Sequence, residues 1–475
     1  MAERGVEVIA AANRWRRRGG ESAFLVGVHA PMTSEMDLED LPVTGIIPPG
    51  LHGRYLKMGA NPVCPDPAAH HWFLGDGMVH GIALEGGRAT WYRNRWILSR
   101  LAAAALGRAP APGPRRGRND TVNTNIVEIG GRPVAVVEAG SFPVELSPAL
   151  DAQRYTSFDG TLTGSFTGHP HRDPATGEHH AIAYDGMIWD SVRHVVLSPA
   201  GKVVRERPIA VTEGPCIHDC AFTARFVIVF DLPVTFSMKA VLGGHAFPFR
   251  WNETHAARVG LIPRADGGTG EIVWCPVEPC FVFHVANAYD DGAQIVLDVI
   301  AYPQMFSTGD SGLDALGRLE RWTIDPAERR VERRVIDPAP QEFPRIDERR
   351  FGQRHRFIYS VAVPADGNTQ LTGATQLYKR DMDGSAVQIH DFGDGHLPGE
   401  FVFIPEHEAG GEDAGWLIGM VLNVGAGTTD LVILDARRFE AAPVAMVHLP
   451  HAIPPGFHGN WFPDGPSGSR AGAIG

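Results

Sequence analysis

Short runs of β-branched and aromatic residues, separated by turn residues, follow one another from about residue 120 onward. Residues 282–289 and 293–301, for example, flank the turn Asp290-Asp291-Gly292. Two such runs around a glycine-containing turn are typical of a β-hairpin. Patterns with helical periodicity are scarce, so the sequence predicts an all-β protein.

The number of hairpins indicates a repeated architecture. One four-stranded blade of a β-propeller needs roughly 40–50 residues, so about 400 residues of hairpins would make about seven to nine blades. A large assembly of β-sandwiches would show a similar pattern. Two apolar stretches break the strand pattern, and each could form a cap or touch lipid. We predict a partly flexible N-terminal extension at residues 1–34 and a single propeller domain at residues 35–465. Two cap insertions are expected within the propeller, near residues 97–118 and 233–255, and a flexible tail at residues 466–475.

Composition and charge narrow the range of partners. The chain of 475 residues is 44% hydrophobic and 21% charged, which is typical of globular proteins. Its net charge is −12, and its dense basic run, Arg14 with Arg16 to Arg18, lies beside the N-terminus. We interpret this run as a solvated tail, with weak attraction to anionic lipid as the alternative. Nucleic acid is not an expected partner.

The termini and the cysteines favour a cytoplasmic protein. Residues 1–12 contain acidic side chains and lack the apolar core of a secretory signal, and no stretch is long and apolar enough to span a membrane. Five cysteines are an odd number and too few for a disulfide framework. The pairs Cys216/Cys220 and Cys275/Cys280 match no common zinc motif, so we expect buried free thiols.

Histidine is abundant, with 21 residues, and four histidines lie in unusual short strings. A single histidine is weak evidence for a metal site. The four strings are far apart along the chain, so these side chains could share a metal only if the fold brings them together. The innermost strands of a propeller converge on one axis and would allow this. The strings are His169-Pro170-His171-Arg172, His218-Asp219-Cys220, Phe283-His284-Val285-Ala286-Asn287 and Gly456-Phe457-His458-Gly459-Asn460.

These strings resemble those of the carotenoid cleavage oxygenase family, and the resemblance covers nearly the whole chain. Further motifs match in the same order. They are Gly53-Arg54-Tyr55, Gly59-Ala60-Asn61-Pro62, residues 71–80, Asn123-Thr124-Asn125, residues 278–281, 342–347, 399–403 and 431–435.

The resemblance implies a seven-bladed β-propeller with a helical and loop cap over an iron(II) ion on the axis. It implies that the ligands are His169, His218, His284 and His458. Neutral imidazoles suit Fe(II), and four of them leave two adjacent coordination positions for dioxygen and for solvent or substrate. Cobalt or zinc could also occupy such a site in vitro.

Three glutamates are expected to orient the ligands, because a metal-bound imidazole needs an acceptor at its second nitrogen. The family motifs place these glutamates at Glu138, Glu342 and Glu400, which we expect to support His218, His284 and His458 respectively. His169 is expected to have no carboxylate partner.

Two further residues near the predicted metal are less clearly assigned. His171 lies two residues from His169, on the same face of a strand, and competes with it as a ligand. The resemblance favours His169. Thr124 matches a threonine whose methyl group limits solvent access to the open metal position, although a plain strand residue is the alternative.

The family implies oxidative cleavage of a carbon–carbon double bond by dioxygen, giving two carbonyl products. The stilbene-cleaving branch has a lysine where this chain has Val137, and the retinoid-isomerase branch has a cysteine-containing motif that residues 117–121 lack. We therefore expect an apocarotenoid or carotenoid, a lipophilic polyene, as substrate, with a stilbenoid as the alternative. Residues 101–106 and 236–249 are expected to form an apolar mouth that contacts membrane lipid, or a packed cap. The rival class is a propeller that binds ligands without catalysis.

Overall fold

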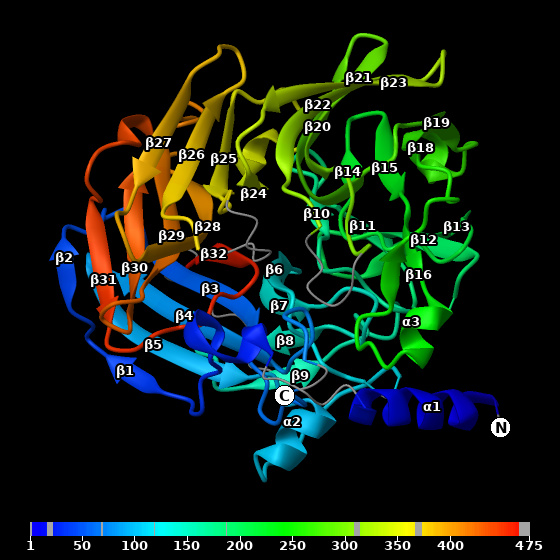
Figure 1. Ribbon diagram of the computed structural model, residues 1–475. Helices are drawn as coiled ribbons and strands as arrows, with labels where there is room; N and C mark the ends of the chain where they lie inside the picture. Colours follow the sequence, from blue (N-terminus) through cyan, green and yellow to red (C-terminus); the bar gives the residue numbers. More distant parts are fainter. Residues whose placement is uncertain are drawn as a thin grey trace.

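The computed structural model describes residues 2–16, 22–67, 70–117, 119–186, 188–307, 314–365 and 373–464. Within these residues, seven antiparallel sheets of four or five strands surround one axis as the blades of a β-propeller (Figure 1). A separate two-stranded sheet lies outside the blades. The predicted all-β class and the seven-bladed propeller are confirmed.

The blades follow one another along the chain. Blade 1 contains β1 (Asp37–Glu39), β5 (Arg88–Trp96), β4 (Gly77–Glu85), β3 (Gly53–Ala60) and β32 (Gly459–Pro463). Blade 2 contains β6 (Asn125–Ile129), β7 (Arg132–Val136), β8 (Val144–Leu146) and β9 (Gln153–Tyr155). Blade 3 contains β10 (His171–Arg172), β11 (His179–Ala183), β12 (Ser191–Leu197) and β13 (Val203–Ala210). Blade 4 contains β14 (Ala221–Phe222), β15 (Phe226–Asp231), β18 (Arg258–Pro263) and β19 (Val273–Pro276).

The second half of the chain forms the remaining blades in the same way. Blade 5 contains β20 (Phe281–Asp291), β21 (Gln294–Tyr302), β22 (Arg318–Asp325) and β23 (Arg330–Asp337). Blade 6 contains β24 (Gln341–Arg345), β25 (Phe357–Ala362), β26 (Gln376–Asp381) and β27 (Val387–Asp391). Blade 7 contains β28 (His396–Pro405), β29 (Gly415–Asn423), β30 (Thr428–Asp435), β31 (Ala445–Leu449) and β2 (Val43–Gly45).

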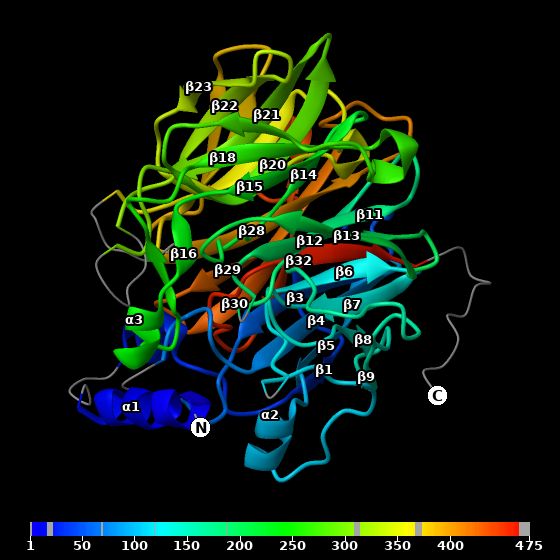
Figure 2. The ribbon, with the colours of Figure 1, turned by 90° about the vertical axis from the view of Figure 1, so that its right-hand side faces the viewer.

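The ring of blades is closed by the two ends of the chain, which each add a strand to the blade at the opposite end of the sequence. The C-terminal strand β32 pairs with β3, with Leu56 opposite Asn460, and lies beside it in Figure 2. The N-terminal strand β2 pairs with β31, with Val43 opposite Val447. Because each end of the chain completes a blade begun by the other end, the ring is closed by hydrogen bonds that link remote parts of the sequence.

Several strands near the axis are buried on both faces, because each blade packs between two others. In β20, the first nine of eleven residues are buried. Between blades 4 and 5, the ring of Trp322 meets that of Phe230 edge-on at 6.2 Å. These apolar interfaces between blades explain the continuous apolar runs in the sequence.

Three helices and the small sheet lie on one side of the propeller in both ribbon views (Figures 1 and 2). The helices are α1 (Ala2–Arg16), α2 (Arg100–Ala105) and α3 (Met238–Leu242), and the small sheet pairs β16 (Val234–Phe236) with β17 (Phe249–Trp251). Short 3-10 helices occur at Ala23–Leu25, Gly27–His29, Ala265–Gly268, Glu348–Arg350 and Ala436–Arg438.

Helix α1 packs against α3, which the sequence did not predict. The Asn13 amide donates a hydrogen bond of 2.7 Å to the Leu242 carbonyl. Gly244 has a φ of +82°, and a Cβ there would lie 2.7 Å from the backbone nitrogen of Arg14, so a glycine permits this close approach. The two predicted cap insertions contain α2 and α3 respectively. The domain boundaries stay a prediction. The predicted tail at residues 466–475 lies outside the described residues.

Two expectations from the sequence can be compared directly with the structure. Among the described residues, no helix has the combined length and apolar character that crossing a bilayer requires. The cysteines are free thiols, and both pairs singled out in the sequence, Cys216/Cys220 and Cys275/Cys280, are buried as predicted.

Candidate metal centre

The four predicted histidines meet on the propeller axis. The Nε2 atom of His218 lies 3.0 Å from that of His169 and 3.3 Å from that of His284, and the Nε2 atoms of His284 and His458 are 3.2 Å apart. The four nitrogen atoms all lie within 4.8 Å of one another. Four side chains that are remote in sequence therefore present their lone pairs to one point.

Each histidine stands at or near the innermost strand of a different blade. His169, His218 and His458 lie one to three residues before β10, β14 and β32, whereas His284 lies within β20. The register of β20 with β21 shifts between Val282 and Val285 and again between Val285 and Asn287. This irregularity turns the His284 side chain toward the axis, which regular alternation would not guarantee.

The donor set fits a divalent transition metal. Two nitrogens that are each about 2.1 Å from one ion, at right angles, are about 3.0 Å apart, close to the spacing of neighbouring imidazoles here. Burial and the three neighbouring imidazoles hold the pKa of His169 well below its usual value, so its ring is neutral and able to ligate. Neutral nitrogen ligands of this kind suit Fe(II) and related ions.

Glu138 lies next to His218, as expected. One carboxylate oxygen accepts a hydrogen bond from His218 Nδ1, and the other accepts one from the Tyr184 hydroxyl. Burial alone would raise the pKa of Glu138, but His218 and these hydrogen bonds lower it below its usual value. The next residue, Ala139, has a φ of +52°, a strained backbone conformation of the kind that occurs at functional sites.

Glu342 lies next to His284 and is fully buried. Its Oε2 accepts hydrogen bonds of 2.5 Å from His284 Nδ1 and from the backbone N–H of Phe343, and its Oε1 accepts one of 2.9 Å from the Tyr302 hydroxyl. Burial disfavours protonation of His284, but the charge and hydrogen bond of Glu342 outweigh it and raise the His284 pKa. Phe343 has a φ of +53° within a register shift of β24.

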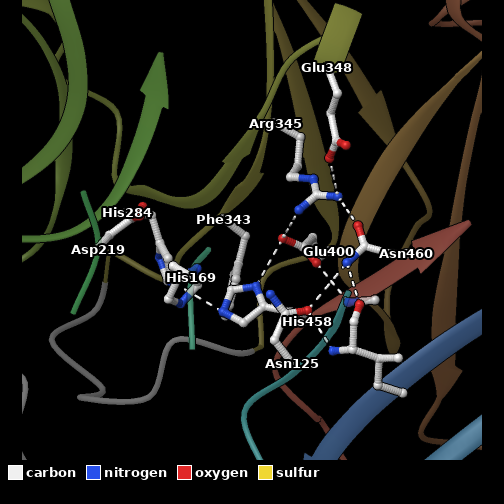
Figure 3. A network of polar contacts seen from close by, with 12 residues as sticks. Asn125, His169, Asp219, His284, Phe343, Arg345, Glu348, Glu400, His458 and Asn460 are labelled. Carbon is white, nitrogen blue, oxygen red and sulfur yellow. Dashed lines mark hydrogen bonds and ion pairs between the residues drawn. The ribbon is translucent and has the colours of Figure 1, made fainter. Parts of the chain in front are cut away.

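Glu400 lies next to His458 and has a charged partner (Figure 3). Its carboxylate accepts hydrogen bonds from His458 Nδ1 at 3.1 Å and from the Gly459 N–H at 2.9 Å. Arg345 lies 3.6 Å from it. Burial would raise the pKa of Glu400, but Arg345 and the histidine lower it to about 2, so the carboxylate is ionised. Glu400 also lies in a register shift, between Pro398 and Phe401 of β28.

His169 and His171 are clearly separated in space. Among the described residues, no carboxylate bonds to His169, whose backbone N–H is held by the Thr167 hydroxyl at 3.1 Å. His171 lies outside the group of four and shares a hydrogen bond of 2.6 Å with Asp219. The geometry therefore favours His169 as the ligand.

Thr124 faces the same space as the histidines. Its hydroxyl donates to the side-chain oxygen of Asn123 at 3.2 Å, which directs the methyl group away from that partner. A Cβ atom on Gly168 would lie 2.6 Å from this methyl carbon, so Thr124 packs directly against the residue that precedes His169.

A cavity of about 630 Å³ opens onto the histidines. Its buried end includes His218, His284, His458, Thr124 and Glu138, and aromatic side chains form its walls, namely Trp72, Phe73, Phe247, Phe283, Phe343 and Phe457. At its other end lie the exposed Leu101, Cys64 and Asn119, with the half-buried Arg116. The site can therefore hold a long apolar molecule with one part beside the metal ligands.

Known proteins match this chain over most of its length. The sequence profile of the family described as retinal pigment epithelial membrane protein matches residues 29–463. A carotenoid cleavage oxygenase of Mycobacterium tuberculosis is 40% identical, over 93% of this chain and 98% of the relative. This chain belongs to the carotenoid cleavage oxygenase family. The predicted enzyme class, an oxygenase, is thereby confirmed.

More distant relatives of this oxygenase include plant and bacterial members. A carotenoid 9,10(9',10')-cleavage dioxygenase of Arabidopsis thaliana is 29% identical, over 92% of this chain and 89% of its own. A solved structure of a cobalt-substituted apocarotenoid oxygenase from Synechocystis superimposes with a TM-score of 0.79 at 28% identity, covering 91% of this chain and 96% of its own. A lignostilbene dioxygenase of Pseudomonas brassicacearum, at 23% identity and a TM-score of 0.83 over 93% of this chain and 99% of its own, shares the fold.

Several residues around the oxygenase's histidines were not assigned a role from the sequence. Arg345 lies within the matched motif at residues 342–347, so its presence beside Glu400 could have been suspected. Tyr184 and Tyr302 lie in no matched motif, and their hydrogen bonds to the glutamates depend on contacts between strands. Asp219 stood beside His218 in a quoted string, yet only the fold reveals its partners.

Proposed function

We propose that this chain is an Fe(II)-dependent dioxygenase that cleaves a carbon–carbon double bond of an apocarotenoid or carotenoid into two carbonyl products. The observation that carries the proposal is the convergence of four histidine Nε2 atoms at the buried end of a large aromatic cavity. The ligands are His169, His218, His284 and His458, and one iron would be held per chain. Both atoms of one dioxygen molecule enter the products, one at each new carbonyl.

The chain's own residues would prepare the site for this reaction. Bound iron(II) would supply the activation of dioxygen next to the double bond. Glu138, Glu342 and Glu400 hold the Nδ1 atoms of three ligands, which fixes each ring and leaves Nε2 free for the metal. The methyl group of Thr124 would restrict solvent at an open coordination position.

The cavity supports a polyene rather than a phenolic stilbene. Its walls are mainly aromatic, and Val137 lies among them where a lysine would be needed to hold a phenol. At the exposed end, Arg116 is anchored by an ion pair with Asp185 and also faces the cavity. A guanidinium at this end favours a substrate whose polar end carries an oxygen acceptor, as an apocarotenal does.

Exposed apolar side chains on α2 and α3 support contact with a membrane surface, which we propose to be its cytoplasmic face. Leu101 and Met238, from α2 and α3, are 67% and 40% exposed. Leu101 also lines the cavity, and large exposed apolar side chains lower the free energy of lipid contact. The double variant L101S/M238S should sediment less with lipid vesicles than the unchanged protein, and equal sedimentation would remove this part of the proposal.

Metal content tests the centre directly. Protein purified without iron and then loaded anaerobically with Fe(II) should hold close to one equivalent, whereas H284A should hold far less. H390A is the matched control, because His390 is equally buried at 6% exposed but lies in β27 of blade 6, where it bonds the Phe439 carbonyl. Equal iron in all three proteins would refute the ligand assignment.

The products test the reaction. With labelled dioxygen, both aldehydes should carry label when they are trapped before exchange with water, and label from water alone would refute the dioxygenase reaction. In a competition between an apocarotenal and a hydroxystilbene, the apocarotenal should be cleaved faster. Faster stilbene cleavage would favour the stilbenoid alternative, and binding of both without products would favour a non-catalytic propeller.

A further inference from the structure

Asp219 links three of the strands that carry the histidines. It follows His218 directly and is buried, with 4% of its surface exposed. Its Oδ1 forms a hydrogen bond of 2.6 Å with Nε2 of His171, which lies two residues after His169. Its Oδ2 accepts a hydrogen bond of 2.9 Å from the backbone N–H of Val285, the residue after His284. Figure 3 shows Asp219 beside His284.

These bonds join blades 3, 4 and 5 at the axis. His171 belongs to β10, Asp219 precedes β14 and Val285 belongs to β20, which are the innermost strands of the three blades. An innermost strand has a neighbour within its sheet on one side only, so N–H groups on its free edge need other partners. At Val285, which lies between two register shifts of β20, that partner is Asp219.

A carboxylate is the side chain that suits this place. Oδ1 accepts a second bond, of 2.7 Å, from the backbone N–H of Cys220, so donors approach both oxygens of Asp219. A carboxylate offers two acceptor oxygens and no donor, whereas an amide must place an NH2 group on one side. In D219N, that NH2 group would face the N–H of either Val285 or Cys220, and a buried donor would lose its partner.

We propose that Asp219 is a positioning residue of the metal centre, which sets the spacing of His169, His218 and His284 through His171 and Val285. The fourth ligand, His458, belongs to blade 1 and is held separately by Glu400. The inference rests on the proposed metal centre and is independent of the substrate. It differs from the role of the three glutamates, because Asp219 bonds to none of the four ligand rings.

Metal affinity of the full-length protein tests the proposal. Fe(II) affinity is measured anaerobically by competition with a chromogenic chelator, and the absorption spectrum of the Co(II)-loaded protein reports the ligand geometry. D219N should bind Fe(II) about 10–100-fold more weakly, the usual effect of losing a residue that supports the ligands, and its Co(II) spectrum should shift. D231N is the matched control: Asp231 is also buried in blade 4 and bonds a histidine, His255, at 2.8 Å.

The outcomes separate the role of Asp219 from general destabilisation. D231N should lose thermal stability but keep the wild-type Fe(II) affinity and Co(II) spectrum. If D219N does not fold, H171F decides the question, because it removes the donor to Asp219 while keeping an aromatic ring against Phe351. H171F should weaken Fe(II) binding severalfold.

Three results would overturn the proposal: wild-type affinity and spectrum in D219N, wild-type affinity in H171F, or an equal loss of affinity in D231N. Failure of the unchanged protein to bind Fe(II) or Co(II) would instead refute the metal centre, and this inference with it.

Discussion

Replacing Glu342 by glutamine separates the charge of this side chain from its shape. The glutamate accepts two N–H groups at Oε2, from His284 and Phe343, and the Tyr302 hydroxyl at Oε1. In E342Q, the NH2 group must face Tyr302, because the other position receives two donors. The bond to Tyr302 then reverses, the bond to His284 remains, and the negative charge behind the imidazole is lost.

The expected magnitude follows from these contacts. Loss of the charge should weaken Fe(II) binding about 10–100-fold, which equals about 1.4–2.8 kcal/mol. In E342A, by contrast, the groups on His284, Phe343 and Tyr302 all lose their acceptor. Each buried group left without a partner costs about 1–3 kcal/mol, so E342A should unfold at much lower urea concentration as well as losing metal.

Chelator competition for Fe(II) and urea unfolding of the metal-free protein measure the two effects separately. E320Q is the matched control, since Glu320 is also buried and accepts hydrogen bonds, from Arg333 and Trp322, but lies away from the axis in β22. It should reduce stability and leave Fe(II) affinity unchanged. Wild-type Fe(II) affinity in E342Q would refute the reasoning that the charge of Glu342 strengthens the His284 ligand.

Three other predictions follow from the structure. T124V keeps the methyl group that packs on Gly168 and should retain most of kcat, whereas T124S should lower it severalfold; equal rates would contradict the role of the methyl group. R116L should raise KM for an apocarotenal about tenfold, which corresponds to about 1.4 kcal/mol, but leave KM for a hydrocarbon carotenoid unchanged. The control R108L, at a residue outside the cavity lining, should change neither KM. Burial and nearby arginines lower the pKa of His194 to about 3, so between pH 6.5 and about 3 the unfolded chain takes up a proton that the folded protein excludes. This group should therefore lower the free energy of unfolding, measured with urea, by about 1.4 kcal/mol for each unit by which the pH is decreased in this range. H194Q should show a smaller decrease.

The sequence predicted the fold class and singled out the four histidines that the structure brings together, for reasons that can be traced to particular residues. Turn residues such as Gly292, which with Ala293 joins β20 to β21, fix hairpins locally, so the all-β class follows from neighbours in sequence. The set of four histidines did not follow from spacing. It came from the matched strings, and the structure supplies the contacts between His284 and Glu342 that spacing could not.

Other features depend on register, which a single sequence does not reveal. Glu342 and Glu400 lie at shifts in β24 and β28, and His284 lies at a shift in β20. A shift of one residue changes the face to which every following side chain points. Strict alternation along these strands therefore fails for the residues that follow each shift. The contacts of Asp219 were missed for a related reason, because its bond to the Val285 N–H joins two blades that lie far apart in sequence.

The charges around the histidines explain why a divalent ion suits the site. The carboxylates next to the four rings are Glu342, Glu400 and Asp219, which are buried, and Glu138, which is half-buried. Among the described residues, two cations lie near these carboxylates: the half-buried Arg345, 3.6 Å from Glu400, and the buried Lys57, whose charge also acts on Glu400. When all these groups are ionised, the carboxylates outnumber the cations, the more so because Arg345 also pairs with Glu348 at 2.9 Å. Buried charge is unfavourable unless it is compensated, and one divalent ion held by four neutral imidazoles supplies the missing charge.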